Sequence, residues 1–258
     1  MLEKMFLFLQ SMKWRFYVST LQIFLGYGLA VWPGFAVKDV LMLVLLFLIF
    51  GPLLHGGIYT LNDILDLNED RMHPVKGKRP IASGRITLPQ AYVFSFVLIC
   101  LALLLSFWVN RVLVVVCLAF LLINMLYSII LKKIPYIEII ANALTHPLRF
   151  YAGVIAAGSF GFHIVALLLF LFAFSIAALK RKKEILERQQ ASRKVLASYS
   201  VFALNAMIVL AGILLLAVTV ISQHAEFFIG IMLLCLYLCV VAGYHYSRSM
   251  KSFINRWY

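Results

Sequence analysis

The sequence predicts an all-α protein, a polytopic membrane helical bundle of about eight transmembrane helices. Two observations are compositional: 64% of the 258 residues are hydrophobic, and the mean hydropathy is +0.99. The third is that apolar runs of roughly 20 residues, enough to span a bilayer as a helix, recur along the chain. This excludes an ordinary soluble domain. We expect one integral membrane domain over residues 1–258.

The expected elements follow the apolar runs. Residues 1–15 carry four charged side chains among aromatics and leucines, which favours an interfacial amphipathic segment; no small-residue cleavage site of a signal peptide follows. The eight spans run over about 16–32, 40–61, 88–109, 112–131, 137–158, 163–179, 196–221 and 227–246. Only Asn110 and Arg111 separate the third span from the fourth, which predicts a tight helical hairpin. Four spans precede Lys132 and four follow it, which suggests two halves.

Charge orients the predicted bundle. One side of the membrane would hold residues 1–15, 62–87, 132–136, 180–195 and 247–258. That side then carries all of the 23 Lys and Arg residues except Lys38, Arg111 and Arg149. By the positive-inside rule it is cytoplasmic, so we expect a multi-pass protein of the cell inner (cytoplasmic) membrane with both termini in the cytoplasm. Topology and anionic lipid then explain the net charge of +13, and no nucleic-acid partner is expected.

The most informative stretch lies after the second span. The chain has only four Asp residues, and three of them, Asp63, Asp66 and Asp70, fall within eight residues. At positions i, i+3 and i+7 of one helix, their carboxylates lie within about 60° of one another and repel unless a cation binds them. Hard divalent ions, Mg²⁺ above all, take carboxylate oxygens and share their coordination with substrate phosphates.

Four cations follow this acidic cluster directly: Arg71, Lys76, Lys78 and Arg79. Such side chains donate charge-assisted hydrogen bonds to phosphate oxygens that a metal leaves free. Segment 62–87 therefore predicts a Mg²⁺-diphosphate site at the membrane surface, on the cytoplasmic side.

A second charged group lies at the end of the sixth span. Lys180 and Glu184 are four residues apart and Arg181 and Glu184 are three apart, so the three side chains can share one helix face. One interpretation is a clamp for a phosphate of the donor substrate, with Glu184 orienting the cations. The other is a positively charged helix end that only sets topology, which suits the neighbouring Lys182 and Lys183.

The fifth span carries a polar stripe. Glu138, Asn142, His146 and Arg149 step by four, four and three residues and so share one face. A charge such as Arg149 well inside a membrane segment requires a partner or a polar cavity. Hydrogen bonding between helices and cavity lining both remain open. His55, beside Gly51-Pro52 in the second span, is interpreted as a packed polar residue.

Four sequence stretches carry a family resemblance that covers residues 16–250. They are Asn62-Asp63-x-x-Asp66-x-x-x-Asp70, Arg79-Pro80-Ile81-Ala82-Ser83-Gly84, Tyr127 with Leu131-Lys132-x-x-Pro135, and Leu148-Arg149 with Ala152-Gly153. On these residues the chain resembles the UbiA superfamily of membrane prenyltransferases. The resemblance implies an all-helical bundle, usually of nine helices where eight are predicted here, with Mg²⁺ held by Asp63, Asp66 and Asp70.

The resemblance also implies roles for the remaining candidates. The expected catalytic residues are Asp63, Asp66, Arg79, Lys180, Arg181 and Glu184. The expected substrate-binding residues are Asn62, Arg71, His73, Lys76, Ser83, Tyr127, Lys132 and Arg149. The implied partners are the membrane and a polyprenyl lipid substrate.

One departure from the family pattern narrows the expected reaction. Typical members carry a second Asp-rich motif after the sixth helix, whereas this chain has no Asp after Asp70. Lys180-Arg181-x-x-Glu184 stands in its place. With Arg71-x-His73-Pro74-x-Lys76, it resembles the decaprenyl-phosphate phosphoribosyltransferase branch.

These residues and the family resemblance leave three candidate functions. The first is Mg²⁺-dependent transfer of a 5-phosphoribosyl group from phosphoribosyl diphosphate to a polyprenyl phosphate, with release of diphosphate. The second is transfer of a prenyl group from its diphosphate to an aromatic or other acceptor, against which the missing Asp motif argues. The third is a non-catalytic membrane scaffold or transporter, against which the gathered carboxylates and cations argue.

Overall fold

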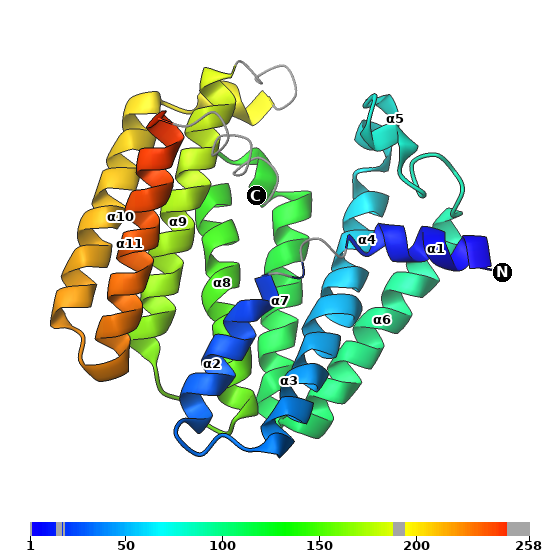
Figure 1. The fold of residues 1–258 in the computed structure, drawn as a ribbon. Helices are drawn as coiled ribbons and strands as arrows, with labels where there is room; N and C mark the ends of the chain where they lie inside the picture. Colours follow the sequence, from blue (N-terminus) through cyan, green and yellow to red (C-terminus); the bar gives the residue numbers. More distant parts are fainter. Residues whose placement is uncertain (1, 14–16, 18, 188–193, 247–258) are drawn as a thin grey trace. The chain divides into compact units, whose positions relative to one another are not determined.

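A computed structural model of the chain describes residues 2–13, 17, 19–187 and 194–246 (Figure 1). Helices dominate these residues, and no strand occurs among them. The α-helices are α1 Leu2–Ser11, α2 Leu21–Val31, α3 Val37–Leu48, α4 Gly56–Leu65, α5 Leu67–Met72, α6 Leu88–Val109, α7 Arg111–Ile129, α8 Ile137–Ala156, α9 His163–Leu186, α10 Val201–Ile221 and α11 His224–Tyr246. A π-helical segment, η2 Ile49–His55, joins α3 to α4, and 3₁₀ turns occur at η3 Lys76–Lys78, η4 Leu131–Lys133 and η6 Lys194–Ser198.

The predicted all-α membrane architecture is confirmed, but the count of eight spanning helices is not. Within the described residues, six helices are long and apolar enough to cross a membrane: Val37–Leu65, Leu88–Val109, Arg111–Ile129, His163–Leu186, Val201–Ile221 and Ala225–Tyr244. The predicted first span corresponds to α2, an apolar helix of only 11 residues. The predicted fifth span corresponds to α8, whose apolar sequence is interrupted by the polar stripe.

The chain forms two compact units. The first comprises Met1–Ile129 and Leu148–Phe160, and the second comprises Ile130–Pro147 and Gly161–Tyr258. The first change of unit lies close to Lys132, where the sequence suggested a division into halves. The sequence did not predict that α8 contributes to both units, with Pro147 at the change between them.

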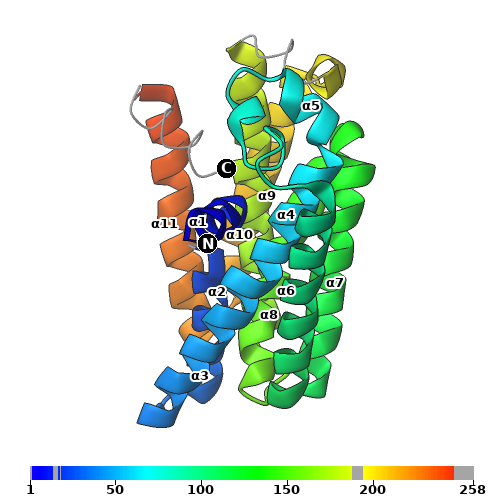
Figure 2. The same ribbon diagram turned by 90° about the vertical axis from the view of Figure 1, so that its right-hand side faces the viewer.

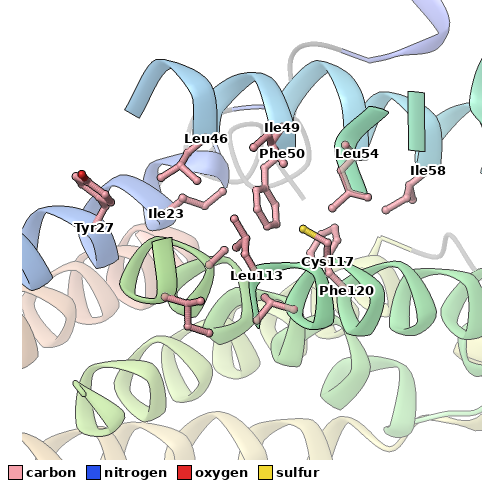
Figure 3. Close-up of a cluster of buried hydrophobic side chains, with 14 residues drawn as sticks. Ile23, Tyr27, Leu46, Ile49, Phe50, Leu54, Ile58, Leu113, Cys117 and Phe120 are labelled. Atoms are coloured by element: carbon pink, nitrogen blue, oxygen red, sulfur yellow. The ribbon is translucent and has the colours of Figure 1, made fainter. Parts of the chain in front are cut away.

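In the first unit, α6 packs alongside both α4 and α7, as two perpendicular views agree (Figures 1 and 2). Its apolar core is drawn in Figure 3, where Leu46, Phe50 and Leu54 of the long second span face Leu113 and Phe120 of α7. These five side chains are fully buried. The core therefore holds the membrane-embedded part of the second span in place, and with it the acidic residues at its end.

The second span is not a regular α-helix throughout. Pro52 lies inside the π-helical segment, where its missing N–H removes one helical hydrogen bond. The segment ends at His55, which is buried, pairs through Nδ1 with the carbonyl of Phe50, and packs edge-on against Phe120 with ring centroids 5.0 Å apart. These contacts agree with the interpretation of His55 as a packed polar residue.

In the second unit, α9, α10 and α11 pack side by side (Figure 1). Helix α9 continues without a break to Leu186, because its polar C-terminal turns keep helical hydrogen bonding to Glu187. Residues 180–186, which the sequence places beyond the sixth span, are therefore helical. Residues 188–193 of the expected segment 180–195 lie outside the described residues.

Candidate active site

The acidic cluster of the first unit is built around a break in a helix. Helix α4 ends at Leu65, Asp66 caps it with φ −89° and ψ 6°, and α5 begins at Leu67. The expectation that Asp63, Asp66 and Asp70 lie along one regular helix is therefore wrong in this respect. The break leaves Asp66 half-buried between the two helices.

Asp63 and Asp70 meet at one cation. Arg79 Nη1 donates to Asp70 Oδ2 at 2.6 Å and to Asp63 Oδ1 at 3.0 Å. Both carboxyl side chains are buried, with residue exposures of 3% and 1%, whereas 31% of the Arg79 side chain is exposed. Lys76 Nζ lies 3.8 Å from Asp70 Oδ1. The two carboxylates that the sequence placed seven residues apart are thus joined by a guanidinium from the following loop.

A further cation comes from the N-terminal segment. Lys13 Nζ donates to Asp63 Oδ1 at 2.6 Å and lies 5.4 Å from the centre of the Tyr59 ring. Burial lowers the pKa of Lys13, and the Asp63 carboxylate opposes that shift. Sequence reasoning missed Lys13 because it lies 50 residues from its partner.

The loop between Asp70 and α6 is held by its own hydrogen bonds. His73 Nδ1 accepts from the backbone N–H groups of Val75 and Lys76, at 3.1 and 3.2 Å, and so shapes the turn before Lys76. Arg71 Nε donates to the carbonyl of Ala82 at 3.3 Å. Ser83 Oγ donates to the carbonyl of Arg79 at 2.8 Å. These expected substrate-binding residues position the loop that carries Arg79.

The other first-unit candidates lie on three different helices. Asn62 Oδ1, next to Asp63, accepts from Ser128 Oγ of α7 at 2.7 Å, and the half-buried Tyr127 precedes that serine. Arg149, on the second half of α8, lies 5.1 Å from the centre of the Phe120 ring and donates to Gln22 Oε1 at 3.5 Å. Arg149 is buried, so these contacts meet the need of a membrane-embedded charge for polar and aromatic partners.

The charged group of the second unit is a hydrogen-bonded network. Arg181 donates to Glu138 twice, from Nε to Oε1 at 2.6 Å and from Nη2 to Oε2 at 3.0 Å. Its Nη1 donates to Glu184 Oε2 at 2.6 Å, which confirms the shared helix face expected from their spacing. Tyr199 Oη donates to Glu138 Oε1 at 2.8 Å, and burial, more than the neighbouring carboxylate, raises the pKa of Tyr199.

This network gives Arg181 a different role from the expected clamp on a substrate phosphate. All three of its guanidinium nitrogens face carboxylates, and the residue is only 6% exposed. Direct contact of Arg181 with a substrate phosphate is therefore not what the geometry favours; Arg181 fixes Glu138 and Glu184. Lys180 and Lys132 of the same unit are half-buried. Lys183 is buried, with Nζ 3.7 Å from Glu187 Oε1.

The carboxylate oxygens of the first unit are the ligands that the implied Mg²⁺ would use. In the described part of the chain, no group of three or more His, Cys, Asp or Glu side chains converges closely enough to hold a metal ion. Asp63 and Asp70, however, share one guanidinium nitrogen and therefore reach a common point. Mg²⁺ is typically held by one or two carboxylates together with waters and substrate phosphates. The hard oxygen donors present here fit that pattern without a third carboxylate.

The helices and composition define a multi-pass membrane protein of all-α architecture. A model of the UbiA prenyltransferase family matches residues 13–257, and the chain belongs to that family. The fold agrees: a solved structure of a UbiA homolog from Archaeoglobus fulgidus bound to GPP and Mg²⁺ superposes with a TM-score of 0.75 at 17% identity, covering 96% of this chain and 94% of that one.

Two curated relatives that the chain resembles in sequence are named as different enzymes. The decaprenyl-phosphate phosphoribosyltransferase of Corynebacterium glutamicum is 34% identical over 145 residues, which are 54% of this chain and 43% of the relative. The digeranylgeranylglyceryl phosphate synthase of Sulfolobus acidocaldarius is 28% identical over 159 residues, 62% of this chain and 55% of the relative. The chain thus spans about half the length of these relatives.

We predict that Arg181 supports the stability of the second unit. Arg181→Met would leave Glu138 buried without its guanidinium, a change that costs about 3–5 kcal/mol of unfolding free energy. Unfolding in mixed detergent micelles would measure this cost. Lys182→Met, at the other neighbouring position of the same helix, is the matched control and should cost less than about 1 kcal/mol, since Lys182 Nζ lies over the Tyr244 ring at 5.6 Å. Equal stability of the two variants would contradict a structural role for Arg181.

Proposed function

We propose that the protein transfers a 5-phosphoribosyl group from phosphoribosyl diphosphate to a polyprenyl phosphate, with Mg²⁺ and with release of diphosphate. One observation carries this choice of donor: no Asp follows Asp70, and Lys180, Arg181 and Glu184 stand where typical family members have a second Asp-rich motif. The names of the relatives from Corynebacterium glutamicum and, at 31% identity over 102 residues, Mycolicibacterium smegmatis support the same choice.

The diphosphate end of the donor would bind at the first-unit cluster. Asp63 and Asp70 would hold Mg²⁺, which neutralises the leaving diphosphate when bound. Arg79 and Lys76 already lie against these carboxylates and are partly exposed, at 31% and 47% of their side chains. They can therefore donate to the phosphate oxygens that the metal leaves free. Asn62 and Arg71 extend the polar surface beside them.

The transfer step needs no strong base. An oxygen of the lipid phosphate forms a bond to the anomeric carbon of the ribose while the bond from that carbon to the diphosphate breaks. The lipid phosphate is already ionised, and the electron pair of the broken bond leaves with the diphosphate. The residues of this chain would therefore act by positioning the two substrates and by neutralising charge as it develops on the leaving group.

From the sequence pattern, we assign the 5-phosphate of the donor to Lys180-Arg181-x-x-Glu184, the stretch that stands in place of the second Asp-rich motif. Lys180 is half-buried and lies next to Arg181 on α9. We assign the phosphate contact to Lys180, while Arg181 and Glu184 act as positioning residues held by Glu138. Lys132, Tyr127, His73, Ser83 and Arg149 remain candidates for contacts with the lipid phosphate or the sugar.

A second candidate reaction keeps the same fold. Transfer of a prenyl group from a prenyl diphosphate is favoured by the name of the Sulfolobus acidocaldarius relative and by the GPP bound in the solved homolog. A non-catalytic scaffold or transporter is the candidate of another class. It is disfavoured because two buried carboxylates with three cations on them serve no purpose that a scaffold requires.

Metal dependence through Asp63 is the first prediction of this function. Asp63→Asn keeps the shape of the side chain and a hydrogen-bond acceptor for Lys13, but removes the negative charge that a metal requires. We expect turnover to fall by about two orders of magnitude, as for loss of a major electrostatic contribution. Product formation with and without EDTA measures this, and near-normal, EDTA-insensitive turnover in the variant would contradict the metal site.

The donor itself is tested with labelled phosphoribosyl diphosphate and a polyprenyl phosphate. Label should enter the lipid phase, and Lys180→Ala should raise the KM for the sugar donor roughly tenfold or more, as expected for one lost charge-assisted hydrogen bond. Lys182→Ala is the control, since Lys182 Nζ lies against the Tyr244 ring at 5.6 Å. Turnover of a prenyl diphosphate and none of the sugar donor would favour the second reaction instead.

Orientation in the inner membrane is proposed from the charge distribution, with the candidate site and both termini on the cytoplasmic side. In a background with the four native Cys replaced by Ala, an impermeant maleimide applied to intact cells should label Gln223→Cys and Lys38→Cys. It should not label Lys78→Cys or Glu187→Cys. All four positions are exposed in the structure. The reverse pattern would place the site on the opposite side.

A further inference from the structure

The N-terminal segment is anchored to the candidate site rather than only lying at the membrane interface. Leu7 of α1 is buried with Ile64, Ile81, Ile86 and Ala91 in one apolar cluster. Figure 1 shows α1 crossing α4 within the first unit. This apolar contact ties α1 to the helix that carries Asp63 and to the loop that follows Arg79.

Two further contacts fix the end of this segment. The rings of Phe8 and Phe94 lie 4.5 Å apart, and Ser11 Oγ lies 3.4 Å from Thr60 Oγ1 of α4. At Lys13, two residues after α1 ends, the backbone adopts a positive φ of 51°, so the chain does not continue as a helix. Lys13 therefore approaches Asp63 from a defined position, as the 2.6 Å contact between them indicates.

The charges at this point are unbalanced in favour of cations. Asp63 Oδ1 accepts from both Lys13 and Arg79, and Asp70 faces both Arg79 and Lys76. Two carboxylates thus face three cationic groups. A free divalent ion approaching Asp63 would be repelled by these cations and would compete with Lys13 for the same oxygen. A divalent ion already bound to diphosphate has a net negative charge and would be attracted instead.

We propose that Lys13 is a positioning residue that acts as an internal counter-ion on Asp63, so that the cluster takes a divalent cation together with a diphosphate and disfavours the free ion. This inference rests on the proposed metal-diphosphate site. It adds that the N-terminal segment controls which form of the metal binds. Once the complex is bound, the Lys13 ammonium can turn from the carboxylate toward the added phosphate charge.

The test measures metal binding rather than turnover. Binding of Mn²⁺, followed by electron paramagnetic resonance on the purified full chain in neutral detergent, is compared with binding of the preformed Mn²⁺-pyrophosphate complex. The unchanged protein should bind the complex at least about tenfold more tightly than the free ion. Lys13→Gln should bind free Mn²⁺ about tenfold more tightly and lose most of the preference for the complex. Lys13→Arg should restore the preference.

Controls separate this inference from the site on which it rests. Lys38→Gln removes one positive charge roughly 37 Å away along the second span and should leave both affinities unchanged. Folded Lys13→Gln protein with unchanged or weaker free Mn²⁺ binding would overturn the role of Lys13. If Asp63→Asn binds Mn²⁺ and its pyrophosphate complex as tightly as the unchanged protein, the proposed metal site itself fails, whatever Lys13 does.

Discussion

Each buried carboxylate among the candidate functional residues of this apolar chain requires a cation beside it. The two charged clusters meet this requirement in two different ways. A buried charge without a partner is costly, and removing one partner leaves the other uncompensated. Arg79 pairs with Asp63 and Asp70 in the first unit, while Arg181 pairs with Glu138 and Glu184 in the second. In each case one guanidinium joins two carboxylates, so the charge pairing also fixes local structure.

The two clusters differ in how accessible their cations are to a ligand. The Arg181 side chain is 7% exposed and each of its guanidinium nitrogens already faces a carboxylate, so little is left for a ligand. The side chains of Lys13, Arg79 and Lys76 are 20%, 31% and 47% exposed, and they outnumber the two carboxylates they face. An excess of accessible positive charge beside carboxylates suits a metal-bound polyphosphate, whereas the buried Arg181 network suits support of the helix end that carries Lys180.

The sequence predicted what depends on local patterns. The apolar runs located the six helices of the described residues that are long and apolar enough to cross a membrane, because a 20-residue hydrophobic stretch is visible without knowledge of its neighbours. The spacing of Asp63, Asp66 and Asp70 indicated the acidic cluster for the same reason. The partners of these carboxylates were harder to predict. Lys13 pairs with Asp63 across 50 residues, and Glu138 pairs with Arg181 across 43, and no periodicity links such positions.

Local geometry also escaped prediction where one residue interrupts a pattern. The break at Asp66 is not marked by Gly or Pro, so the acidic stretch reads as one helix although α4 and α5 are separate. The polar stripe of α8 reads as one face, yet Glu138 and Arg149 belong to different compact units on either side of Pro147. The stripe therefore serves two separate purposes: Glu138 joins the Arg181 network, and Arg149 packs against Phe120.

The charge balance bears on the choice between the two candidate reactions. A prenyl diphosphate has all its negative charge at one end, so two acidic motifs that gather metal ions around that end are a consistent arrangement. Phosphoribosyl diphosphate carries a further phosphate at the other end of the sugar, and that phosphate requires cations rather than carboxylates. Loss of the second acidic motif alone would weaken a prenyl site. Under the proposed function, the Lys180-Arg181-x-x-Glu184 stretch at that position would supply cations for the second anionic group of the donor.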